Sequence, residues 1–159
     1  MTVEAAVFDL LSNDAGVSGV VSNRIYPVKL PQDPTYPAVT YFRVSALRHS
    51  AMGKDTGLVE KRIQISSWAK LYSEVNDLAD RVRDAMQRTR GVFSGVEILD
   101  IFMDGDGPEI WEDEVNVYQA ITDCNVIYRE RNTLYLVSSG VLSGASLTRG
   151  SPATYWEAA

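Results

Sequence analysis

Apolar residues at helical spacing begin the chain. They recur every three or four positions and would form one buried stripe: Val3, Ala6, Val7, Leu10 and Leu11. Thr2 can cap the first turn, and Glu4 favours the positive end of the helix dipole. Residues 13–16 break this pattern with polar side chains and a glycine. The valines within residues 17–21 then indicate one further helical turn.

A pair of strands is predicted after a proline-rich connection. Residues 23–27 read as a short extended piece, and three prolines within residues 31–37 exclude a helix there. Polar and apolar positions alternate over residues 38–47 and again over residues 58–68, as in half-buried strands. The polar residues 48–57 contain two glycines and predict a mobile hairpin loop, so the two strands would be antiparallel.

The clearest helix is expected from about residue 74 to residue 90. Ser73 is its expected N-cap, Gly91 its expected C′ residue, and Asp77 and Arg81 form an exposed pair four residues apart. Its buried stripe consists of Val75, Leu78, Ala79, Val82, Ala85 and Met86. Two more strands follow, over residues 96–103 and 115–128, with a turn predicted at residues 104–108.

This order of elements predicts an α+β fold. We expect an antiparallel β-sheet of about four strands, with two helices packed on one face, in a domain of residues 3–131. Residues 132–159 are rich in Ser, Gly and Ala, with isolated Leu, Tyr and Trp, and they show no helical stripe. We interpret them as an extended C-terminal arm whose aromatic side chains dock on this domain or on a neighbour.

Composition narrows the function classes. The chain has 159 residues and a formal net charge of -6, which argues against gripping nucleic acid, because phosphate binding needs clustered Lys and Arg. An acidic surface is compatible with a channel wall along which DNA slides. Cys124 is the single cysteine, so a disulfide within the chain is excluded. The N-terminus lacks the pattern of a signal peptide, and no apolar run predicts a membrane span.

Candidate chemistry is sparse. His49, the one histidine, lies in a polar segment and is interpreted as solvated. Cys124 lies in a predicted strand and is interpreted as a small buried hydrophobe, with a reactive thiol as the minor alternative. Residues 104–109 carry acidic side chains on a tight turn, but they lack the ligand order of an EF-hand. The glycines lack the lysine of a phosphate loop, so no catalytic residue, metal or cofactor is predicted.

Four segments carry a resemblance to a known family. They are residues 23–27 (Asn-Arg-Ile-Tyr-Pro), residues 30–41, residues 62–75, which include Trp68, and residues 78–86 on the second helix. Their order and spacing over about residues 3–130 resemble the tail-completion, or tail-terminator, proteins of long-tailed bacteriophages. Residues after about 131 look like an addition to that family core.

The resemblance implies a structural virion protein and not an enzyme. Members of the family form a homo-oligomer, a hexameric ring, at the head-proximal end of the tail. The ring ends growth of the tail tube and joins the tail-tube protein to a head or neck connector protein. Viral DNA passes through the ring without specific binding, no membrane is involved, and assembly takes place in the host bacterial cytoplasm.

Loop polarity and exposed aromatic residues suggest where partners or neighbouring subunits make contact. The candidate contact residues are His49, Met52, Lys54, Asp55, Asp104, Asp106, Glu109, Tyr135, Tyr155 and Trp156.

Three alternatives remain open at this point. Another head–tail connector, such as a neck or head-completion protein, has the same structural class and binds the opposite partner. A small nucleic-acid-binding module would need a basic face, and a small-molecule or nucleotide enzyme would need a convergent set of catalytic residues.

Overall fold

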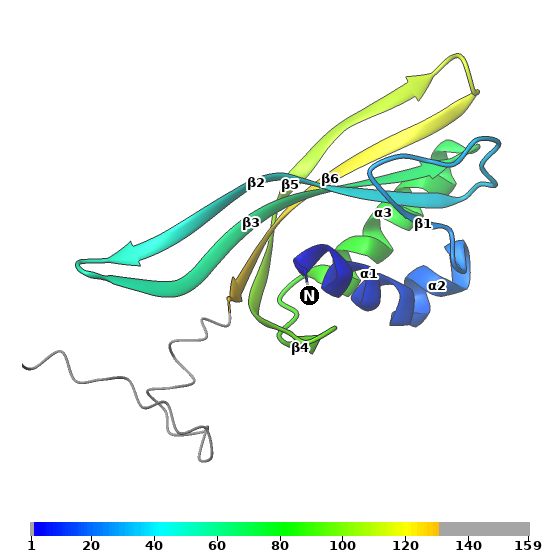
Figure 1. Cartoon of the computed structure of the whole chain (residues 1–159). Helices are drawn as coiled ribbons and strands as arrows, with labels where there is room; N and C mark the ends of the chain where they lie inside the picture. Colours follow the sequence, from blue (N-terminus) through cyan, green and yellow to red (C-terminus); the bar gives the residue numbers. More distant parts are fainter. Residues whose placement is uncertain (1, 131–159) are drawn as a thin grey trace, which may run out of the picture.

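The computed structural model describes residues 2–130, apart from the side chains of Lys54 and Asp55, and within this range forms three helices and one six-stranded sheet (Figure 1). The elements in chain order are α1 (Val3–Asn13), α2 (Ala15–Val21), β1 (Ile25–Pro27), β2 (Ala38–Ala51), β3 (Lys54–Ala69), α3 (Tyr72–Met86), β4 (Gly91–Phe93), β5 (Val96–Glu112) and β6 (Val117–Arg129).

The strand order is β1-β2-β3-β6-β5-β4. The four predicted strands are present as the central strands β2, β3, β6 and β5, and all their pairings are antiparallel. The predicted sheet was incomplete, because β1 adds in parallel to β2 and β4 adds antiparallel to β5. The α+β class is confirmed, with a mixed sheet of six strands in place of about four antiparallel ones.

The helical layer also contains one more helix than expected. Thr2 caps α1 as predicted, since its hydroxyl accepts a hydrogen bond from the amide of Ala5. The further helical turn is a separate helix, α2, because Asp14 caps it by accepting a hydrogen bond from the amide of Val17 at 2.9 Å. The side chain of Arg24 then donates to the carbonyl oxygens of Val20 and Pro37, which fixes the path from α2 to β1.

The boundaries of α3 differ from the prediction at both ends. The helix begins at Tyr72, and Leu71 is its N-cap residue, so Ser73 lies inside the first turn and does not cap it. It ends at Met86, because the backbone amide of Arg88 donates to Ile101 of β5 and the chain joins the sheet. Gly91 is consequently the first residue of β4 and not a C′ residue.

The predicted loop over residues 48–57 is wrong. Strand β2 continues to Ala51, and β3 begins at Lys54, so the turn is confined to Met52 and Gly53. Gly53 has a φ of 78°, a conformation that glycine adopts readily. The polar residues therefore form a strand pair exposed on both sides, and such a pair shows no hydrophobic alternation.

The predicted turn at residues 104–108 is wrong for a related reason. These residues lie inside β5, and the hairpin turn occupies residues 113–116 instead. The strand is irregular between Asp106 and Glu109, and a Cβ atom at Gly107 would come within 2.9 Å of the Ile121 side chain. The glycine and Pro108 thus mark a bulge with a close backbone approach, which the sequence pattern does not distinguish from a turn.

The hydrophobic core lies between the helices and one face of the sheet (Figure 1). Its largest fully buried side chains come from both layers and include Leu11, Leu78, Met86, Ile63, Ile65 and Ile101. Lys61 reaches the edge of this core, where its ammonium group lies 3.3 Å from the Glu4 carboxylate. This ion pair connects the first turn of α1 with the centre of β3.

We predict that Leu78→Ala lowers the free energy of unfolding by about 2 to 5 kcal/mol, because it leaves a cavity between α3 and the sheet. Leu71→Ala is the matched control, since Leu71 is 57% exposed and gives no side-chain cap. We expect it to change stability by less than about 0.5 kcal/mol. Urea unfolding followed by circular dichroism measures both, and equal effects would contradict this view of the core.

Candidate assembly surfaces

The first hairpin arm (residues 43–60) projects beyond the helical layer at one end of the sheet (Figure 1). Within β2 its side chains are largely exposed on both faces, and Met52 lies fully exposed at the tip. Two side-chain contacts connect the arm, and the first is an ion pair. Arg48 lies 3.0 Å from Glu130, and His49 lies 3.6 Å from Glu60. Lys54 and Asp55 follow the tip as the first residues of β3.

The second hairpin arm (residues 104–122) projects from the other end of the sheet (Figure 1). Three of the candidate contact residues, Asp104, Asp106 and Glu109, lie along its β5 strand. Asp106 accepts a hydrogen bond from Arg83 of α3 at 2.7 Å. The arm also contacts α3 through an aromatic pair, because Tyr118 of β6 packs against Tyr72 of α3. Trp111 of β5 packs against the same Tyr118 ring.

Each arm has one free edge in the part of the chain that the structure describes. Strand β1 pairs with β2 only at residues 39–41, so β3 is the only described strand that pairs with residues 43–51. On the other side, β4 pairs with residues 96–98 of β5. Just after α3, the amide of Arg88 donates to Ile101, and the side chain of Gln87 accepts from the amide of Met103, so β5 is covered as far as Met103. Among the described strands, β6 alone pairs with residues 104–112.

The two free edges carry opposite charge. The β2 edge (residues 43–51) contains the basic or titratable residues Arg43, Arg48 and His49 and no acidic residue. The β5 edge (residues 104–112) contains the acidic residues Asp104, Asp106, Glu109 and Glu112 and no basic residue. Charged side chains, bulges and Pro108 at these edges reduce uncontrolled pairing with other strands.

Arginines near the face of the sheet opposite the helices are held by carboxylates. Arg62 donates to Asp123 at 2.6 Å, and this hydrogen bond, the charge of Asp123 and a smaller contribution from Asp104 raise the pKa of its guanidinium. Arg88 and Arg90 both bind Asp100, at 3.3 and 2.9 Å. These groups form internal ion pairs instead of a cluster of cations available for phosphate binding.

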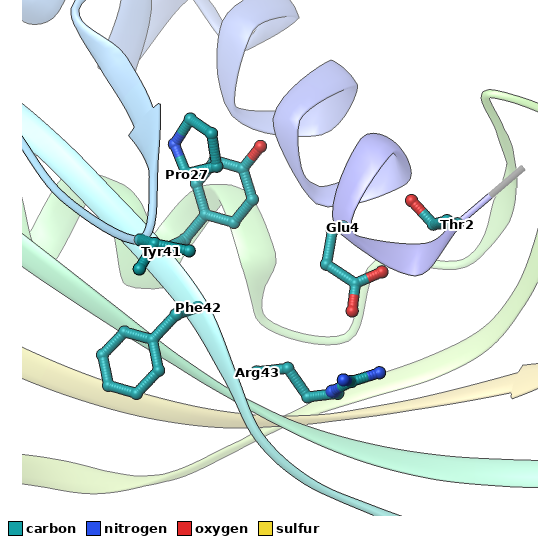
Figure 2. Close-up of a pocket in the computed structure, with 7 residues that line it drawn as sticks. Thr2, Glu4, Pro27, Tyr41, Phe42 and Arg43 are labelled. Atoms are coloured by element: carbon teal, nitrogen blue, oxygen red, sulfur yellow. The ribbon is translucent and has the colours of Figure 1, made fainter.

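A groove of about 550 Å³ lies where the β2 edge begins, next to the N-terminus of α1 (Figure 2). It is mainly apolar and is lined by Thr2, Glu4, Pro27, Val28, Tyr41, Phe42 and Arg43. Figure 2 shows Glu4 on α1 and Arg43 on β2 at the same side of the groove. Burial opposes ionisation of Glu4, but its own backbone amide and the neighbouring Lys61 together lower the pKa of its carboxyl group.

The remaining candidates for chemistry were metal-binding groups and Cys124. Within residues 2–130, no group of three or more His, Cys, Asp or Glu side chains is placed to hold a metal ion. Cys124 is fully buried in the core, as the strand pattern predicted. None of the helices in this part of the chain combines the length and apolar character that a membrane crossing requires.

Comparison with known proteins gives the family. The sequence model of the family described as "Tail completion protein gp17" matches residues 5–129. The chain belongs to the tail completion protein gp17 family. The resemblance inferred from the four sequence segments is thus confirmed, and the chain is a structural tail protein.

A solved structure supports the fold of this tail completion protein. A chain in a structure described as "Virion of native gene transfer agent (GTA) particle" superposes with a TM-score of 0.62 at 16% sequence identity. The match covers 80% of this chain and 94% of that chain. At this identity the likeness shows the shared fold alone. No curated protein matches the sequence significantly.

The structure places the candidate contact residues on different surfaces of the tail completion fold. His49, Met52, Lys54 and Asp55 lie on the first arm, and Asp104, Asp106 and Glu109 lie on the second, at the opposite end of the sheet. Tyr135, Tyr155 and Trp156 lie outside the described residues, as does the expected C-terminal arm. Sequence reasoning missed Arg43 and Trp111, because their importance depends on which strand edges are free.

We predict that Cys124 does not react with a thiol reagent in the folded protein. Burial, and to a smaller extent the charge of Asp123, raise the pKa of its thiol to about 12. At pH 8 only roughly one part in ten thousand would be thiolate, the reactive form. Labelling with a maleimide should therefore need denaturant, and rapid labelling under native conditions would contradict the buried position.

Proposed function

We propose that this tail completion protein forms a ring at the head-proximal end of a phage tail. The ring stops growth of the tail tube and joins the tail to the head or neck. The match to the tail completion family over residues 5–129 carries this proposal. The protein acts by binding alone, and occupying the polymerising face of the last tube ring is sufficient to end growth.

The geometry of the two arms supports a ring. They lie at opposite ends of one sheet and carry unlike free edges, so a contact between them joins two different surfaces of neighbouring copies. Such a head-to-tail contact produces a closed ring when the rotation between neighbouring copies is a whole fraction of a full turn. A hexamer is the size that the resemblance implies. A self-complementary dimer would instead bring like-charged edges together.

The charge distribution supports passage of DNA without specific binding. The chain has a net charge of -6, and Arg62, Arg88 and Arg90 are each held by a carboxylate. A channel lined by paired charges and carboxylates gives the DNA backbone few places to bind.

The remaining contacts are assigned by position. We propose that residues 3–131 form the ring-building domain and that the tip of the first arm, with His49, Met52, Lys54 and Asp55, contacts the tail tube or the neck. The C-terminal arm of residues 132–159, with Tyr135, Tyr155 and Trp156, is proposed to clasp an adjacent subunit or the connector protein. The assembled ring belongs to the virion and forms in the host bacterial cytoplasm.

Light scattering and negative-stain imaging of the purified protein, alone and mixed with tail tubes, test the proposed function. We expect rings, either free in solution or seated on one end of each tube, and tubes so capped should no longer elongate. Binding to isolated heads, with no effect on tubes, would indicate another connector protein instead. A DNA mobility shift that disappears at higher salt would indicate a nucleic-acid-binding module.

A further inference from the structure

We infer that neighbouring copies join through the two free edges, so that the β5 edge of one copy lies along the β2 edge of the next. Trp111 of the first copy then occupies the groove beside Arg43 of the second, and Asp106 and Glu109 face Arg43 and Arg48. This inference rests on the proposed ring and specifies the contact that closes it.

The charges favour contact between unlike edges. Among residues 2–130, Arg43, Glu109 and Glu112 form no ion pair within 4.0 Å, so they are available to a partner. Pairing two β2 edges would place arginines against arginines, and pairing two β5 edges would place carboxylates against carboxylates. Like charges across an interface disfavour the wrong partner, so the head-to-tail arrangement is selected.

The faces of the strands also agree. Arg43 and Arg48 lie opposite Ile63 and Val59, two core residues, and therefore point to the helix side of the sheet. On the β5 edge, the side chains that point to the helix side are those of Asp106, Glu109 and Trp111. They lie opposite Thr122, Ala120 and Tyr118 of β6, and Asp106 contacts α3 directly. A second copy that continues the sheet keeps its helices on the same side, so these side chains meet.

Strand direction fixes how the edges meet. Successive antiparallel pairings from β2 through β3 and β6 to β5 make β2 and β5 run in opposite directions. A neighbouring copy whose strands keep these directions has its β5 edge antiparallel to β2. Because Arg43 and Met103 lie at the same level across the sheet, this copy is also shifted along the strands, as in a ring whose strands are inclined to its axis. The C-terminal end of β5, which holds Trp111, is then next to the start of the β2 edge at Arg43.

The groove is suited to an aromatic side chain at that place. It is mainly apolar, it borders Arg43, and Val28 in its wall is 72% exposed. Trp111 is exposed enough to reach a partner, and an arginine beside an indole ring gains from cation–π attraction. Pro108 and the bulge around it interrupt main-chain pairing, so these side-chain contacts contribute much of the specificity.

Charge reversal and charge exchange test this contact in the full-length protein. Arg43→Glu and Glu109→Arg should each raise the concentration at half-assembly by about tenfold or more, because each turns attraction into repulsion. The double variant R43E/E109R restores an opposite-charge pair at every junction and should regain most of the assembly. Glu97→Arg is the matched control, since Glu97 lies on the part of β5 that β4 already covers.

Sedimentation velocity measures assembly, and circular dichroism melts confirm that each variant is folded. If the wild type forms rings and both single reversals form them equally well, the edge contact is wrong while the ring function stands. Failure of the double variant to recover, when both single variants are defective, would also overturn the pairing. If the wild type forms no ring even on tail tubes, the edge contact and the proposed function fail together.

Discussion

The long pairing of β3 with β6 is the interaction on which the rest of the structure depends. It runs without interruption from Leu58 opposite Arg129 to Ala69 opposite Tyr118, and both strands bury one face against the helices. The sheet nevertheless extends much further than the helical layer. α3 has 15 residues and a length of about 22 Å, whereas β5 has 17 residues and extends about 56 Å. The central pairing therefore supports two arms whose tips extend beyond the helices.

Both projecting arms have exposed strand edges, and exposed edges normally promote aggregation. In this chain each edge is interrupted by bulges and carries charges of mainly one sign, basic on β2 and acidic on β5. The same features that disfavour pairing of identical edges allow pairing of unlike ones. Solubility of the free subunit and head-to-tail joining thus have a common physical origin.

Periodicity predicted the parts of the fold that are buried on one side. The stripe of α1, the buried face of α3 and the centres of the four long strands all follow from the spacing of apolar residues. Where a strand pair is exposed on both faces, as in the first arm, this spacing disappears. Residues 48–57 and 104–108 consequently resembled loops in the sequence, and they are strands in the structure apart from the turn at Met52 and Gly53.

The candidate site was predictable only in part. Polarity located His49, Met52, Asp104, Asp106 and Glu109 on projecting segments, and the structure places them on the two arms. The free edges depend on where β1 and β4 stop, which is a matter of long-range pairing. Local spacing therefore gives no reason to connect Arg43 with Trp111. Only the long-range pairing shows that both residues lie on strand edges without a partner strand.

Disulfide crosslinking tests most directly whether the subunits join head to tail through these edges. The variant A46C/E109C has one new thiol on each edge, both on the helix side of the sheet, and the native Cys124 is buried. Mild oxidation should give a ladder of covalent oligomers that ends at the closed ring, whereas each single variant gives no ladder. A double variant that remains monomeric, or that stops at dimers, while rings are visible by electron microscopy would contradict the edge contact.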